Sequence, residues 1–180
     1  MTAPSLYDAV TGLPTRDLFL DRLFMALRSA ERTGDSTAVV LVHVRCDEIE
    51  LDTPAGGIDA DTAEVLRSIG ERLTGAVRAF DSVARMKDST FAIIFPGSMD
   101  EDRLQMLARR ILFELSPPVQ LGLRQFFLSA RLGGTTADAG FDDADTLLAQ
   151  AGAALDQAEH QDEDLFIFFH APDVLEQPSS

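Results

Sequence analysis

Arginine side chains offer the chemistry for holding a small anion in this sequence, and an aspartate follows one of them closely. Arg78 precedes Asp81 by a short interval, and Arg109 and Arg110 stand together later in the chain. A planar guanidinium donates paired hydrogen bonds to a phosphate or to the edge of a base. Each residue also has a plainer interpretation: Arg78 as a cation at a helix C-terminus, Asp81 as a turn residue, and the arginine pair as a solvated helix face.

The overall charge restricts the partners of the chain. Thirty acidic side chains against fifteen basic ones give a formal net charge of −15. This charge repels the phosphate backbone of nucleic acids and anionic membrane surfaces. The sequence contains no apolar run of membrane-spanning length, and its first residues lack the features of a signal peptide. We therefore expect a cytoplasmic protein that neither binds nucleic acid nor inserts into a membrane.

Patterns for metal binding or nucleophilic catalysis are weak. Cys46 stands alone, which argues against a disulfide framework and a multi-cysteine metal site. His43 lies in an apolar stretch with no second histidine nearby, so a hydrogen-bonded core or pocket histidine is favoured over a metal ligand. We expect neither a metal nor a cofactor.

Apolar residues at helical spacing predict four helices that would position these side chains. Thr15 is a candidate N-cap of the first, and Gly34 follows its last turn. The predicted helices cover residues 16 to about 31, about 61 to 79, 104 to 115 and 147 to 158.

Short apolar and β-branched runs predict the strands. The run 38–44 is apolar on both faces, as expected for a strand in the interior of a sheet. Residues 82–86 and 90–95 predict a hairpin whose turn is 87–89. Further strands are predicted at 119–121 and 125–132, as an antiparallel pair around Gly122, and at 165–169.

The order of these elements predicts an α/β (α+β) fold in which helices cover a mostly antiparallel central sheet. Gly133 and Gly134 indicate a bulge or a site of close packing within that sheet. We expect one domain at residues 8–170, after a lead-in at 1–7 and before a disordered tail at 171–180.

Two segments resemble the GGDEF family of diguanylate cyclases, which condense two GTP into cyclic di-GMP. Residues 8–19, DAVTGLPTRDLF, are similar to the family pattern D-x-L-T-G-L-P-N-R-x-x-F. Residues 78–91, RAFDSVARMKDSTF, keep the frame of R-x-x-D, a five-residue spacer and G-G-D-E-F. The resemblance extends from about Asp8 to Phe169 and implies a ferredoxin-like palm shared with class III nucleotide cyclases.

The resemblance also implies that the catalytic signature is degenerate. Its five positions are occupied by Lys87, Asp88, Ser89, Thr90 and Phe91. The family holds divalent metal with carboxylates, because metal stabilises the charge that develops in phosphoryl transfer. The matching positions here are His43, Arg45 and Thr90, and none of these is a carboxylate.

Other substrate contacts implied by the resemblance are also missing. The guanine-reading positions fall near Leu51 and Ala63, and the phosphate-facing lysine is matched by Glu159. We therefore expect the domain not to be an enzyme.

The R-x-x-D pair, by contrast, is retained. In many family members this pair binds cyclic di-GMP at an allosteric site, and the resemblance assigns its roles to Arg78 and Asp81. Arg110 matches a further arginine of that site, while Arg109 and Arg85 are candidate accessory residues. The two function classes left open are a cyclic di-GMP-binding sensor and a protein-interaction domain that binds no nucleotide. A protein partner or a homodimer is compatible with both.

Overall fold

The chain forms four helices and seven strands in the residues described by the computed structural model, which are 5–52, 57–141, 143–162 and 165–170. In chain order these are α1 (Arg16–Thr33), β1 (Thr37–Cys46), α2 (Ala60–Ala76), β2 (Ser82–Lys87), β3 (Thr90–Pro96), α3 (Glu101–Leu115), β4 (Val119–Leu121), β5 (Arg124–Phe126), β6 (Leu128–Ala137), α4 (Ala144–His160) and β7 (Phe166–Phe168). The predicted fold class is confirmed.

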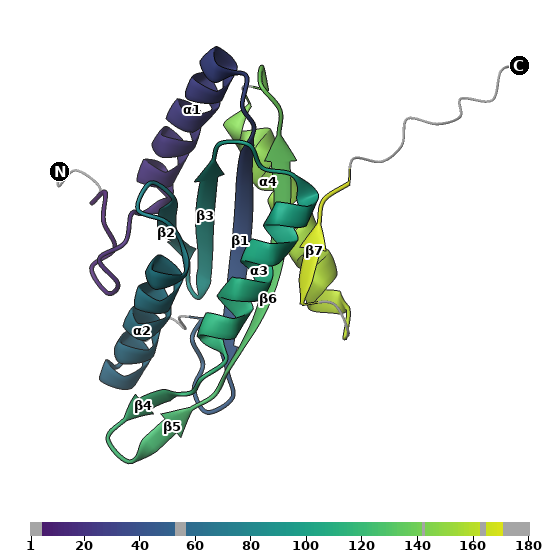
Figure 1. Cartoon of the computed structure of the whole chain (residues 1–180). Coiled ribbons are helices and arrows are strands. Elements are labelled where there is room, and N and C mark those ends of the chain that lie inside the picture. The colour runs from purple at the N-terminus through teal and green to yellow at the C-terminus, as the bar shows by residue number, and fades with distance from the viewer. Residues whose placement is uncertain (1–4, 53–56, 142, 163–164, 171–180) are drawn as a thin grey trace, which may run out of the picture.

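A five-stranded sheet in the order β2-β3-β1-β6-β7 forms the centre of the molecule (Figure 1). The pairs β2–β3, β3–β1 and β1–β6 are antiparallel, whereas β6 and β7 are parallel. In this register His43 of β1 lies opposite Thr90 of β3 and Arg131 of β6. The sheet thus brings His43 beside the signature hairpin.

Apolar side chains on both faces of the sheet form two core layers. Alternate residues of β1 point to opposite faces, so Val40 and Val42 pack in one layer and Val39 and Leu41 in the other. Helices α2 and α3 cover the first layer, and α1 and α4 cover the second (Figure 1). The prediction that β1 is buried on both faces is confirmed.

The helix ends follow capping chemistry with one exception. Asp59, Asp100 and Asp143 accept hydrogen bonds from backbone N–H groups in the first turns of α2, α3 and α4. Gly34 ends α1 in the left-handed conformation. Thr15 occupies the N-cap position of α1 but makes no side-chain cap, because its hydroxyl donates to the carbonyl of Leu6 at 3.2 Å.

The predicted signature hairpin is confirmed, with β2 and β3 joined at residues 88–89. The prediction of a single strand at 125–132 is wrong. The chain passes from β5, which pairs only with β4, to β6, which joins the main sheet beside β1. Phe127 separates these two strands. A sequence pattern cannot assign one apolar run to two different sheets, since strand partners are set by the tertiary fold.

Close packing at Gly133 is confirmed. A Cβ atom at this position would lie 2.1 Å from the backbone nitrogen of Leu155 in α4. The glycine therefore allows α4 to lie directly on β6.

Two predicted segments at the ends of the chain lie wholly or partly outside the residues that the structure describes. The expected tail at 171–180 and the first four residues of the expected lead-in lie outside the described residues. Among the helices that are described, none is long and apolar enough to cross a membrane.

Candidate functional site

An ion pair holds the N-terminal motif against the signature hairpin. The buried Arg85 guanidinium donates from Nη1 to both carboxylate oxygens of Asp8, at 3.1 and 3.2 Å. Its Nε donates to the backbone carbonyl of Asp88 at 2.8 Å. Arg85 was a candidate accessory ligand residue, but these contacts give it a structural role.

Asp8 is the centre of the turn formed by the N-terminal motif. Its carboxylate accepts hydrogen bonds from the backbone N–H and the hydroxyl of Thr11, each at 2.8 Å. Burial raises the pKa of Asp8, but the Thr11 hydrogen bonds and the nearby Arg85 outweigh burial and hold that pKa below its ordinary value. The first motif thus positions a charged Asp8 to anchor the hairpin.

The residues in the turn of the hairpin differ from the family pattern in side chain and charge. Lys87 and Asp88 stand where the family has two glycines, and Asp88 adopts a φ of 50°, in the left-handed region that glycine favours. Phe91, which retains the last signature residue, is fully buried in the core. The hairpin therefore keeps its anchor, while side chains occupy its turn.

A chain of polar contacts fills the region between β1, α4 and the hairpin. His43 Nδ1 is hydrogen-bonded to the Glu159 carboxylate near the end of α4, and His43 Nε2 lies 3.5 Å from Asp52 Oδ2. The other Asp52 oxygen accepts hydrogen bonds from the hydroxyl and the backbone N–H of Ser89. The prediction of a hydrogen-bonded His43 is confirmed.

Sequence reasoning missed Asp52 as a member of this cluster. Burial raises the pKa of Asp52, but hydrogen bonds from Ser89 and the proximity of His43 hold it below the ordinary value. Asp52 follows Leu51 in a loop whose path has no periodic pattern, so the only available signal was its proximity in sequence to a family position. Within the signature, Ser89 contacts the cluster directly, whereas Thr90 is the register partner of His43.

The donor set at this position does not fit a divalent cation. Arg45, Arg131 and Ser129 line a small cavity of about 70 Å³ together with His43 and Glu159. The two arginines place positive charge where a cation would bind, and no metal-binding group of three His, Cys, Asp or Glu side chains occurs among the described residues. We therefore derive no metal-dependent step for this site.

Arg78 and Asp81 lie together in the turn between α2 and β2. The Asp81 carboxylate accepts a hydrogen bond from the backbone N–H of Arg78 at 2.8 Å, and the N–H of Asp81 donates to the Arg78 carbonyl at 3.1 Å. Burial raises the pKa of Asp81 above its ordinary value, although this hydrogen bond and the charge of Arg78 oppose the shift. The Arg78 side chain is exposed at the end of this turn.

Arg110 lies on the side of α3 that faces α2. It precedes Glu114 by about one helical turn, so both project from the same side of the helix. Arg72 in α2 donates to the backbone carbonyl of Pro118, just beyond the end of α3, at 2.9 Å, so this end of α3, which carries Glu114, lies near α2. Arg110 is exposed and has no ion pair within the described part of the chain.

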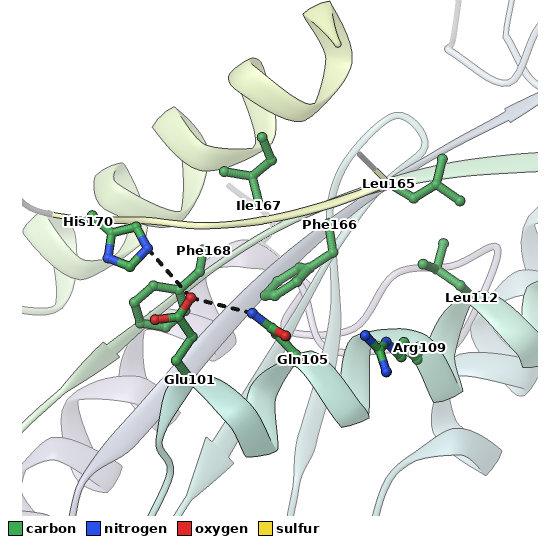
Figure 2. A pocket seen from close by; sticks show the side chains of 9 residues that line it. All are labelled: Glu101, Gln105, Arg109, Leu112, Leu165, Phe166, Ile167, Phe168 and His170. Carbon is green, nitrogen blue, oxygen red and sulfur yellow. Dashed lines mark hydrogen bonds and ion pairs between the residues drawn. The ribbon is translucent and has the colours of Figure 1, made fainter. Parts of the chain in front are cut away.

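Arg109 projects from a different side of α3. It lines a groove between α3 and β7 (Figure 2), whereas Arg110 does not line this groove. The structure therefore brings Arg78 and Asp81 together, places Arg110 on the neighbouring helix and directs Arg109 elsewhere.

The central sheet with its covering helices has the palm fold of nucleotide cyclases. The solved GGDEF domain of TpbB (also YfiN) from Pseudomonas aeruginosa has a TM-score of 0.79 to this structure and 26% sequence identity. The similarity covers 91% of this chain and 94% of that one. The class of fold is therefore that of a GGDEF domain.

The chain belongs to the GGDEF family. The family profile "Diguanylate cyclase, GGDEF domain" matches residues 5–164. The uncharacterized protein sll1895 of Synechocystis is 29% identical over 156 residues, which are 86% of this chain and 22% of that protein. The bifunctional diguanylate cyclase/cyclic di-GMP phosphodiesterase MucR of Pseudomonas aeruginosa is 27% identical over 167 residues, 93% of this chain and 24% of MucR. The chain thus spans about a quarter or less of these relatives.

Proposed function

We propose that this chain is a GGDEF domain without cyclase activity that binds cyclic di-GMP in the cytoplasm and passes this signal to a protein partner. The observation that carries the proposal is the contact chain from Glu159 through His43 and Asp52 to Ser89, in which His43, Ser89 and Glu159 stand at positions matched to metal-binding, signature and phosphate-contact residues of the family. Loss of the catalytic carboxylates leaves binding as the retained chemistry.

Two features argue against turnover of GTP. A triphosphate near Asp52, Glu159 and Asp88 would be repelled by their carboxylates, and this repulsion acts against the attraction of Arg45 and Arg131 in the same region. The site also lacks the donor set that would hold magnesium to offset this repulsion.

The positions of three residues support binding of cyclic di-GMP at a second site. Arg78 is exposed beside Asp81, and Arg110 is exposed without an ion pair on the α2-facing side of α3. Guanidinium groups can donate to phosphate and guanine, and the Asp81 carboxylate can accept from guanine N–H groups. The net charge of −15 opposes an anionic ligand, but salt screens charges beyond about 8 Å and leaves the local arginines dominant.

Calorimetric titration with cyclic di-GMP tests this proposal. We expect binding that weakens with salt, and we expect Arg78→Ala and Arg110→Ala to lose about 2 to 4 kcal/mol of binding free energy. To test Asp81, Asp81→Asn is preferable to Asp81→Ala, because the amide oxygen can still accept the hydrogen bond from the Arg78 N–H that holds the turn. The matched control is Arg28→Ala, since Arg28 is exposed on α1 and pairs with Glu31.

The catalytic part of the proposal has its own test. Incubation with GTP and Mg²⁺ should give no cyclic di-GMP, as followed by mass spectrometry. Product that scales with protein concentration would disprove the loss of activity without affecting the binding experiment.

A protein-interaction domain that binds no nucleotide is the second candidate. Met106 and Phe113 flank Arg110 by about one helical turn on either side, and their side chains are 69% and 73% exposed. Exposed apolar residues around an arginine are common at protein interfaces. Absence of a binding signal at high micromolar cyclic di-GMP would favour this function over the sensor.

A further inference from the structure

A groove between α3 and β7 has the features of a peptide-binding site. It has a volume of about 500 Å³ (Figure 2), and neither Arg78 nor Arg110 is among its lining residues. Leu112 from α3 and Phe166 and Phe168 from β7 contribute apolar side chains to its lining. The remaining lining residues are Glu101, Gln105, Arg109, Leu165, Ile167 and His170.

The open side of β7 can accept another strand. β7 is at the edge of the five-stranded sheet and pairs only with β6 in the described part of the chain. The Leu165 carbonyl accepts from Leu132 at 2.8 Å, and the Phe169 N–H donates to Gly134 at 2.7 Å. Backbone groups alternate in direction along a strand, so those of Phe166 and Phe168 point to the open side. The backbone N–H and C=O groups of Phe166 and Phe168 can therefore form hydrogen bonds with an extended peptide.

The two ends of the groove carry opposite charges. Glu101 lies at one end, 3.5 Å from His170 Nε2, and accepts a long hydrogen bond of 3.4 Å from Gln105. Arg109 lies toward the other end and has no ion pair among the described residues (Figure 2). Two helical turns separate Glu101 from Arg109, a rise of about 12 Å.

These two charges define the direction of a strand bound in the groove and the spacing of its charged residues. Figure 2 shows Leu112 near Leu165 and Glu101 near His170, so α3 and β7 run in opposite directions. A strand antiparallel to β7 would therefore begin near Glu101 and end near Arg109. Four strand residues rise about 13 Å and return to the same face, which matches the separation of the two charges.

We propose that the groove binds an extended segment of a partner protein as an added antiparallel strand on β7. The segment has a basic residue at Glu101, an apolar residue two positions later against the phenylalanine side chains, and an acidic residue two positions further at Arg109. Main-chain hydrogen bonds to Phe166 and Phe168 supply affinity, and the two charged ends set orientation and register. This site is independent of the proposed cyclic di-GMP site.

Fluorescence anisotropy with a labelled peptide tests the charge arrangement. The probe is Lys-Thr-Phe-Thr-Asp amide with a fluorophore on an N-terminal glycine linker, and the charge-swapped control is Asp-Thr-Phe-Thr-Lys amide with the same linker. The full chain should bind the probe with a dissociation constant of about 10 to 100 µM. The few contacts of a short added strand stabilise the complex only slightly more than the entropy lost on ordering the peptide destabilises it. The swapped peptide should bind at least about tenfold more weakly.

Exchange of charge on the protein provides the reciprocal test. Arg109→Glu should lose at least about tenfold in affinity for the probe, and because both ends of the groove are then acidic it should bind the probe and the swapped peptide about equally. The matched control Arg28→Glu on α1 should keep wild-type affinity. Equal affinity of the wild-type chain for both peptides, or no effect of Arg109→Glu on affinity for the probe, would disprove the proposal.

Backbone pairing separates strand addition from side-chain capture alone. With the probe bound, the amide protons of Phe166 and Phe168 should exchange more slowly with solvent by NMR. If the N–H groups of the two threonines in the probe face β7, N-methylation of these threonines should abolish binding. If instead the N–H groups of the lysine, phenylalanine and aspartate face β7, N-methylation of those three residues should abolish binding. Binding that survives both modified peptides, or no binding up to millimolar probe, would overturn the inference.

Discussion

Arg85 on β2 contacts Asp8 across 77 residues of sequence, with Nη1 3.1 Å from Oδ1. This contact joins the N-terminal motif to the signature hairpin, and the Arg85 side chain is only 8% exposed. Both motifs that identify the family are therefore linked by a structural contact that does not depend on catalysis. The pair therefore gives both motifs a role in holding the fold together.

Asp8→Asn should destabilise the fold by about 2 to 3 kcal/mol, because it leaves the buried Arg85 without a carboxylate. Urea unfolding followed by circular dichroism measures the loss. Asp21→Asn on the exposed face of α1 is the matched control and should change stability by less than about 0.5 kcal/mol. Similar small effects of both variants would show that the ion pair contributes little.

The contribution of Asp8 should depend on pH in one direction. Burial raises the pKa of Asp8, but its hydrogen bonds and Arg85 bring it below the ordinary value of 3.8. A carboxyl with a depressed folded pKa stabilises the protein fully above the unfolded pKa and loses this effect as the pH falls through the folded pKa. The stability gap between wild type and Asp8→Asn should be constant near neutral pH and shrink below about pH 4. A gap that widens on acidification would contradict the sign of this shift.

Asp88→Gly should be more stable than Asp88→Ala by about 1 kcal/mol, because the φ of 50° at this position is accessible to glycine without a Cβ penalty. Thermal unfolding of the two variants measures the difference. Both variants lack the Asp88 carboxylate, so the difference between their stabilities reports the cost of this backbone conformation. Equal melting temperatures would show that the turn relaxes to another conformation.

Gly133→Ala should destabilise the protein by about 3 kcal/mol or more, since the added Cβ would lie 2.1 Å from the Leu155 nitrogen and 2.6 Å from the Ala151 oxygen. Gly152→Ala in α4 is the control, because its Cβ would contact Leu41 at an ordinary 3.9 Å. This second change should stabilise the helix by about 0.5 to 1 kcal/mol. Chemical denaturation of both variants tests whether α4 packs directly on β6. Equal effects would indicate a looser interface.

Local patterns in the sequence were sufficient for most elements of the fold. The continuous apolar run of β1 and the helical stripe of α3 are short-range features, and the structure confirms both elements. The spacing around Asp81 also placed the signature turn between β2 and β3. These features were predictable because residues close in sequence determine periodicity and turn formation.

The arrangement of the candidate site depended on contacts that no local pattern contains. His43 and Glu159 are 116 residues apart, and they meet only because β1 lies beneath the end of α4. Asp52 joins them from a loop, and β6 separates from β5 at Phe127 because its partner is β1. The sequence determined which side chains were present and which elements carried them. The tertiary structure decided their partners, because burial and strand pairing bring distant residues together in ways that depend on the whole chain.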